Sequence, residues 1–151
     1  MLRRLILGVG EEARADDAAG LLAVRELRRL GIDAEEVRDL FLLPELLAGA
    51  EEAIIIDAVL CEAPAGELVV FDAHLHQSTV RFPVSTHGFG LGESIQLTEA
   101  LHRLPKQCLI YGISAKCFYL GEPPMPEVVA GALRAARAIQ QRVITDRGTP
   151  E

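Results

Sequence analysis

Hydrophobic positions along the chain form two patterns that follow one another. Largely apolar runs occupy 5–9, 53–59 and 107–113, as is typical of strands buried on both faces of a sheet. In 16–30 and 126–143, apolar residues instead recur every three or four positions, which predicts amphipathic helices. This alternation predicts an α/β fold with a mostly parallel sheet.

Residues that typically begin or end helices indicate where the helix boundaries lie. We expect the first helix to begin near Asp16 or Asp17 and to end before Gly31, and the last helix to open at Pro126. Weaker patterns predict a short edge strand, a short helix and a longer helix at, respectively, 33–40, 43–50 and 91–103.

The strand expected at 67–72 runs against the others. It follows Asp57 after only about nine residues, too few for the crossover that a parallel return needs. The connection 73–90 must then bring the chain back to the opposite edge, and its length makes it a candidate functional loop. We therefore expect a three-layer sandwich, a twisted sheet with one antiparallel strand and helices on both faces. It forms a single domain over 1–144, followed by a polar tail at 145–151.

Charge and composition exclude several classes of function. The chain has 151 residues, half of them hydrophobic, with 15 basic and 22 acidic side chains and a net charge of -7. An acidic chain with scattered basic residues argues against binding to nucleic acid or to an anionic membrane. No apolar run reaches the roughly 20 residues that span a bilayer, and no signal-type cleavage site follows the N-terminus. We expect a cytoplasmic protein.

The glycine turn "GVGEEARADDAAG" carries an unusual amount of negative charge. If the first and third strands are neighbours, Asp17 and Asp57 meet at the carboxyl edge of the sheet, where such folds bind ligands. Asp57 is expected at the end of its strand, and the loop that carries His87 must return to the same edge. Two carboxylates and one imidazole suit a divalent transition metal.

Other interpretations of these residues remain open. The turn has only the first two glycines of a dinucleotide-binding motif, and its carboxylates would repel a pyrophosphate. Asp16 could instead cap the helix while Asp17 favours its dipole. Asp57 could bind turn amides, and His87 could make a structural hydrogen bond. The chain has neither an HExxH helix nor a GxSxG elbow, so it signals neither a resident-zinc peptidase nor a serine hydrolase.

Taken in order, six segments resemble the nickel–iron hydrogenase maturation proteases, over residues 5–139. They are "GVGEEARADDAAG", "IIIDAV", "PAGELVVF", "STHGFGLGESIQL", "LIYGIS" and "PEVVAGAL". The resemblance implies an α/β peptidase that removes a C-terminal extension from the hydrogenase large-subunit precursor after nickel insertion. It also implies that Asp17, Asp57 and His87 contact the nickel, which would explain the acidic turn.

The chain departs from the family pattern at three places. Glu11 follows the glycine turn where the family usually has asparagine, Ala18 follows the acidic pair where glycine is common, and "GISA" replaces the family's "GI-Q-P". We expect the precursor's nickel to dock on Asp17, Asp57 and His87, to position the scissile peptide and to polarise its carbonyl or a water. In this hypothesis nickel arrives with the substrate. The alternative is a noncatalytic relative that binds a metal-containing protein tail in the same acidic cleft.

Overall fold

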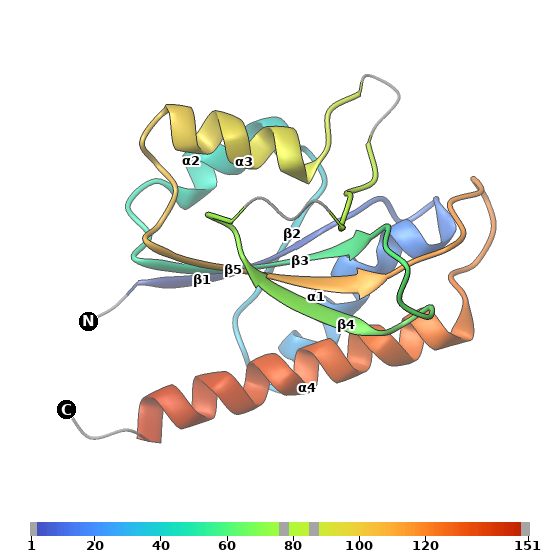
Figure 1. Ribbon diagram of the computed structural model, residues 1–151. Helices are drawn as coiled ribbons and strands as arrows, with labels where there is room; N and C mark the ends of the chain where they lie inside the picture. Colours follow the sequence, from blue (N-terminus) through green and yellow to red (C-terminus); the bar gives the residue numbers. More distant parts are fainter. Residues whose placement is uncertain (1–2, 76–78, 85–87, 149–151) are drawn as a thin grey trace.

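The computed structural model describes residues 3–75, 79–84 and 88–148, and in them a five-stranded sheet has the order β2-β1-β3-β5-β4 (Figure 1). Strands β1, β2, β3 and β5 run parallel, and β4 pairs antiparallel with β5. The predicted α/β fold and its antiparallel strand are confirmed. The strands are β1 Arg4–Val9, β2 Glu35–Val37, β3 Glu52–Val59, β4 Leu68–Asp72 and β5 Gln107–Ser114.

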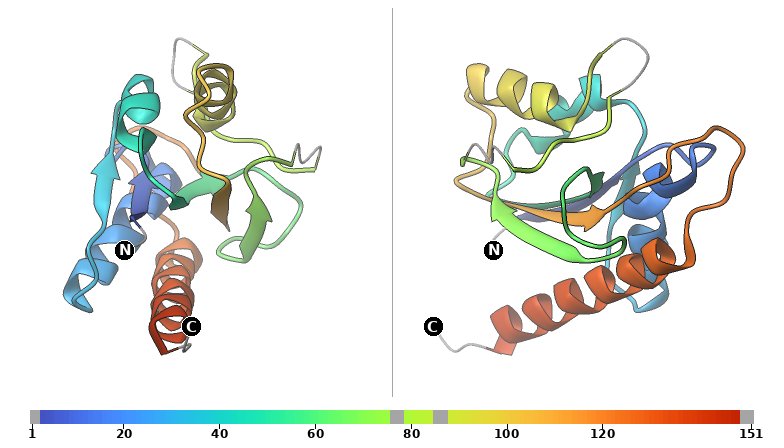
Figure 2. Two further views of the ribbon diagram at one scale, coloured as in Figure 1. Left: turned by 90° about the vertical axis from the view of Figure 1, so that its left-hand side faces the viewer. Right: turned by 45° about the vertical axis from the view of Figure 1, so that its right-hand side comes forward.

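Helices cover both faces of the sheet, as predicted (Figure 2). Helices α1 and α4 pack on one face, and α2 and α3 pack on the other. Within the described residues, none of the helices is both long and apolar enough to cross a membrane. The helices and 3-10 turns are α1 Ala19–Arg29, α2 Leu43–Leu47, α3 Leu91–Ala100, α4 Pro126–Gly148, η1 Ala15–Ala18 and η2 Leu40–Leu42.

Successive side chains of the central strands fill two separate cores. Ile6 pairs in register with Ile54, and both are buried against α1 and α4. Leu7 pairs with Ile55, and both are buried on the opposite face against α2 and α3. Because β1 and β3 bury both faces, their sequences are apolar over most of their length, with Asp57 as the buried polar exception in β3.

The first helix begins later than the sequence predicts. Asp16 and Asp17 lie in η1, and α1 starts only at Ala19. Ala15 adopts the left-handed conformation, with φ of 51°, which turns the chain before the helix begins. The expected helix start near Asp16 or Asp17 is therefore wrong by two or three residues.

The ends of the later helices also differ from expectation. Helix α3 ends at Ala100, not Arg103, because His102 adopts φ of 56° and the Arg103 N–H donates to the Thr98 carbonyl, as in a Schellman ending. Helix α4 continues to Gly148 and so enters the segment 145–151 that the sequence assigns to a polar tail.

Helix α1 lies close to the sheet because Gly20 has no side chain. A Cβ atom at this position would overlap the backbone carbonyls of Val9 and Ile56, which cannot move without shifting β1 and β3. We expect Gly20→Ala to lower the free energy of unfolding by about 2 kcal/mol, measured by urea denaturation. Gly92→Ala in α3 is the matched control, since its Cβ would make only an ordinary contact with Phe82. Equal losses in the two variants would contradict this explanation.

Candidate functional site

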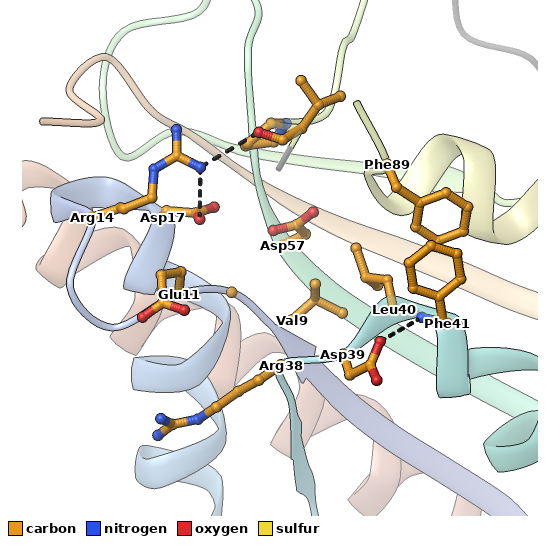
Figure 3. Close-up of a pocket in the computed structure, with 13 residues that line it drawn as sticks. Val9, Glu11, Arg14, Asp17, Arg38, Asp39, Leu40, Phe41, Asp57 and Phe89 are labelled. Carbon is orange, nitrogen blue, oxygen red and sulfur yellow. Dashed lines mark hydrogen bonds and ion pairs between the residues drawn. The ribbon is translucent and has the colours of Figure 1, made fainter. Parts of the chain in front are cut away.

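A pocket of about 370 Å³ opens at the carboxyl ends of β1 and β3 (Figure 3). Asp17 and Asp57 both line it, so the structure brings together two of the three residues that the sequence selects. The convergence follows from the strand order, because β1 and β3 are neighbours. The pocket is lined by Val9, Gly10, Glu11, Arg14, Asp17, Arg38, Asp39, Leu40, Phe41, Asp57, Pro83, Val84 and Phe89.

Asp57 is the more deeply buried of the two carboxyl groups, with 2% of the residue exposed. Burial raises its pKa well above 3.8, and the nearby charge of Asp17 raises it further, while a hydrogen bond from the Ala58 N–H acts in the opposite direction. The expectation that Asp57 ends its strand is wrong. Strand β3 continues for two residues beyond it, because Ala58 and Val59 still pair with β5.

Asp17 projects from η1 and is 8% exposed. Burial raises its pKa to about 6, and the charge of Glu11 contributes to the rise. Arg14 lowers that pKa, since its Nη1 atom lies 4.0 Å from the Asp17 Oδ2 atom. The Nη1 atom of Arg14 also donates to the Val84 carbonyl at 3.4 Å, so the guanidinium spans one side of the pocket (Figure 3).

Asp16, the other member of the acidic pair, has a structural role. Its fully buried side chain accepts hydrogen bonds from the backbone N–H groups of Lys116, Cys117 and Met125, at 2.9, 2.9 and 2.8 Å. The backbone N–H of Asp16 in turn donates to the Cys117 carbonyl at 3.0 Å. The interpretation of Asp16 as a helix cap is therefore wrong. The residue ties the glycine turn to the connection between β5 and α4, and only Asp17 faces the pocket.

The third predicted ligand, His87, lies outside the described residues, and its place beside the carboxyl groups stays a prediction. Residues 3–75, 79–84 and 88–148 contain no group of three or more His, Cys, Asp or Glu side chains that could hold a metal ion. His74 lies outside this pocket, with its Nε2 atom 2.8 Å from the Pro105 carbonyl.

Two parts of the pocket were missed from the sequence. The rings of Phe41 and Phe89 stack with centroids 4.1 Å apart and planes at 8°, and they form an apolar side of the pocket. No local signal joins two phenylalanines from such distant segments. Arg14 was also missed, although a single arginine within the acidic "GEEARADD" is a signal that could have singled it out.

The two carboxyl groups give the pocket a chemistry that depends on protons. Burial raises the pKa of Asp57 well above its usual range, and it raises the pKa of Asp17 to about 6. A divalent cation can bind such a pair by displacing protons, and carboxylate oxygens together with an imidazole fit a transition metal. The same groups can also transfer a proton to or from a bound peptide.

Comparison with known proteins decides the family. Residues 38–142 match the sequence model described as hydrogenase maturation protease. The chain belongs to the hydrogenase maturation protease family. The resemblance found in the sequence is thereby confirmed, as is the prediction that the protein is a peptidase. Protein FrxA from Pyrococcus furiosus is similar to this maturation protease, with 34% identity over 128 residues, 82% of this chain and 93% of FrxA.

Solved structures agree with this maturation protease in fold. The hydrogenase maturation protease HybD from Thermococcus kodakarensis is 32% identical, with a TM-score of 0.75 over 93% of this chain and 99% of HybD. The hydrogenase maturating endopeptidase HybD from E. coli is 21% identical, with a TM-score of 0.72 over 96% of this chain and 94% of that one, which shows a shared fold.

Proposed function

We propose that this maturation protease is the endopeptidase that removes the C-terminal extension of a nickel–iron hydrogenase large-subunit precursor after nickel insertion. The observation that carries the proposal is the pair of buried carboxyl groups, Asp17 and Asp57, in one pocket at the carboxyl edge of the sheet. Burying two acids side by side costs stability, and such costly groups are typical of functional sites. The partner is the precursor, and processing takes place in the cytoplasm.

In this proposal Asp17, Asp57 and His87 contact the nickel of the precursor and are also the catalytic residues. Their oxygen and nitrogen atoms form a donor set that suits nickel. Nickel supplies the polarisation of the scissile carbonyl or of a water. The chain itself orients the peptide over the two carboxyl groups and shields them from bulk solvent. Asp17, with its pKa of about 6, is suited to exchange a proton near neutral pH.

The free pocket is a poor site for a free cation, which supports nickel arriving with the precursor. Burial of Asp57 raises its pKa and so disfavours the carboxylate form that a cation needs. It would also meet the positive charge of Arg14, 4.0 Å from Asp17. Nickel held by the precursor's own ligands brings additional binding energy from the protein surfaces around it.

The test is to incubate the protein with nickel-loaded and nickel-free large-subunit precursor and to read the intact masses. We expect the loaded precursor alone to lose its C-terminal extension. Equal cleavage of both forms would contradict the dependence on nickel. Absence of cleavage, with a cognate precursor and verified nickel loading, would contradict the endopeptidase function.

A further inference from the structure

One side of the pocket is an apolar wall, made by Phe41, Phe89 and Val84. Phe41 is 61% exposed and Val84 is 47% exposed, although both line the same pocket as the two buried carboxyl groups. Large apolar side chains exposed in a concave site gain stability when an apolar group covers them. The wall therefore favours an apolar ligand group immediately beside the acids.

The wall is held in place by hydrogen bonds. The Asp39 carboxylate accepts the Phe41 N–H at 3.0 Å and so caps η2. The Ser94 hydroxyl, fully buried in α3, donates to the Leu40 carbonyl at 2.7 Å and fastens η2 to that helix. The exposed ring of Phe41 is thus fixed by its backbone and by its stacking on Phe89. A preorganised ring binds a partner with little loss of conformational entropy.

The opposite side of the pocket is polar. Figure 3 shows Glu11 and Arg14 on the side of the glycine turn, the Phe41–Phe89 stack across from them, and Asp57 between the two sides. An extended peptide alternates the direction of its side chains. A peptide lying over Asp57 can therefore place one side chain on the aromatic stack while its backbone remains near the carboxyl groups.

We propose that Phe41 and Phe89 form a subsite for an apolar side chain of the precursor, within a few residues of the bond that is cut. The inference rests on the proposed function and concerns which precursor peptides the acidic pocket accepts. The occupant is the peptide itself, since the wall and the acids share one pocket of about 370 Å³, which admits side chains but no folded surface. Acidic side chains are disfavoured there because Asp17 and Asp57 lie in the same pocket.

The test compares kcat/KM for wild-type protein, Phe41→Ala and Leu42→Ala on nickel-loaded precursor. We expect Phe41→Ala to lower kcat/KM roughly tenfold, mainly through KM, because truncating a contact aromatic typically costs that much. Phe41→Leu keeps an apolar side chain, so its kcat/KM should lie between those of wild-type protein and Phe41→Ala. Leu42 is the matched control, since it belongs to the same turn and is 46% exposed but does not line the pocket. Its variant should stay within about twofold of wild type.

Substitutions in the precursor identify the occupant. Each apolar residue of the precursor near the cut bond is changed to alanine in turn. We expect one of these substitutions to lower kcat/KM of the wild-type protease roughly tenfold. The same substitution should cause no further loss when the protease carries Phe41→Ala. Full activity of Phe41→Ala would overturn the subsite, and so would independent effects of Phe41→Ala and the precursor substitution. Cleavage by the wild-type protein would in either case leave the proposed function intact.

Binding separates the failure of the subsite from the failure of the function. The Kd of nickel-free precursor, which the proposed function leaves uncut, is measured for wild-type protein and for Phe41→Ala. A roughly tenfold weaker Kd with Phe41→Ala supports the subsite even if no cleavage is ever observed, and equal Kd values would overturn it. Thermal unfolding of each variant verifies that the proteins compared are folded.

Discussion

Asp57→Asn is expected to abolish cleavage of nickel-loaded precursor while leaving the protein folded and more stable at neutral pH. Asparagine keeps the shape of the side chain but cannot provide the carboxylate that the proposed mechanism needs. It also removes an acid that is buried at a cost, as its raised pKa indicates. Intact mass of the precursor measures the first effect, and urea denaturation measures the second.

The raised pKa of Asp57 determines how the stability of the wild-type protein changes with pH. Because the pKa of Asp57 is raised on folding, the native protein binds a proton that the unfolded chain releases above about pH 4. The stabilising contribution is present below pH 4 and is lost as pH rises through the raised pKa. The Asp57→Asn protein lacks this loss, so the difference between its free energy of unfolding and that of wild type grows with pH.

Asp17 affects stability in the same direction. Its pKa is raised from 3.8 to about 6, which corresponds to roughly 3 kcal/mol of stability that is lost as pH rises from about 4 to about 6.

Asp33→Asn is the matched control, because Asp33 is exposed and outside the pocket. It should cleave the precursor normally and follow the wild-type pH dependence. Lower stability of Asp57→Asn at every pH would contradict the prediction and would assign Asp57 a structural role. Normal cleavage by Asp57→Asn would remove it from the catalytic residues.

Asp16→Ala is expected to cause the largest loss of stability, on the order of 4 kcal/mol. The substitution deprives three backbone N–H groups, those of Lys116, Cys117 and Met125, of the carboxylate that accepts their hydrogen bonds. Asp16 is fully buried, so water does not replace its oxygens without rearrangement of the turn. Urea denaturation measures the loss.

Asp72→Ala is the control for Asp16→Ala, since among the described residues the Asp72 side chain accepts one hydrogen bond, from the His74 N–H at 2.8 Å. Its loss should be about 1 kcal/mol or less. If both variants lost the same amount, the three bonds to Asp16 would not carry the stability assigned to them. Asp16→Ala should also reduce cleavage, because the turn that it fixes carries Asp17.

The sequence predicted the sheet and the meeting of Asp17 with Asp57 because both depend on local patterns. Apolar runs locate strands buried on both faces, and the strand order then brings their carboxyl ends together. The different roles of Asp16 and Asp17 could not be predicted. Two adjacent acids look alike in a sequence, and only the contacts of Asp16 with 116–125 separate them.

Other differences also arise from contacts between distant segments. Strand β3 extends past Asp57 because β5 provides partners for two more residues, which a polar residue in the sequence conceals. The Phe41–Phe89 stack joins η2 to the start of α3, and neither segment has a pattern that indicates the other. Helix α3 is followed by a left-handed residue, His102, at a place where a sequence more often signals the helix end with glycine.

The contacts of Asp16 also set the order in which the site can form during synthesis. The glycine turn leaves the ribosome early, whereas Lys116, Cys117 and Met125 follow only after about three quarters of the chain has been made. Until then the Asp16 side chain has none of its three native donors, and the turn that carries Asp17 is not fastened. A nascent chain therefore completes its acidic pocket last, so that a partly synthesised protease carries the acids but not the site.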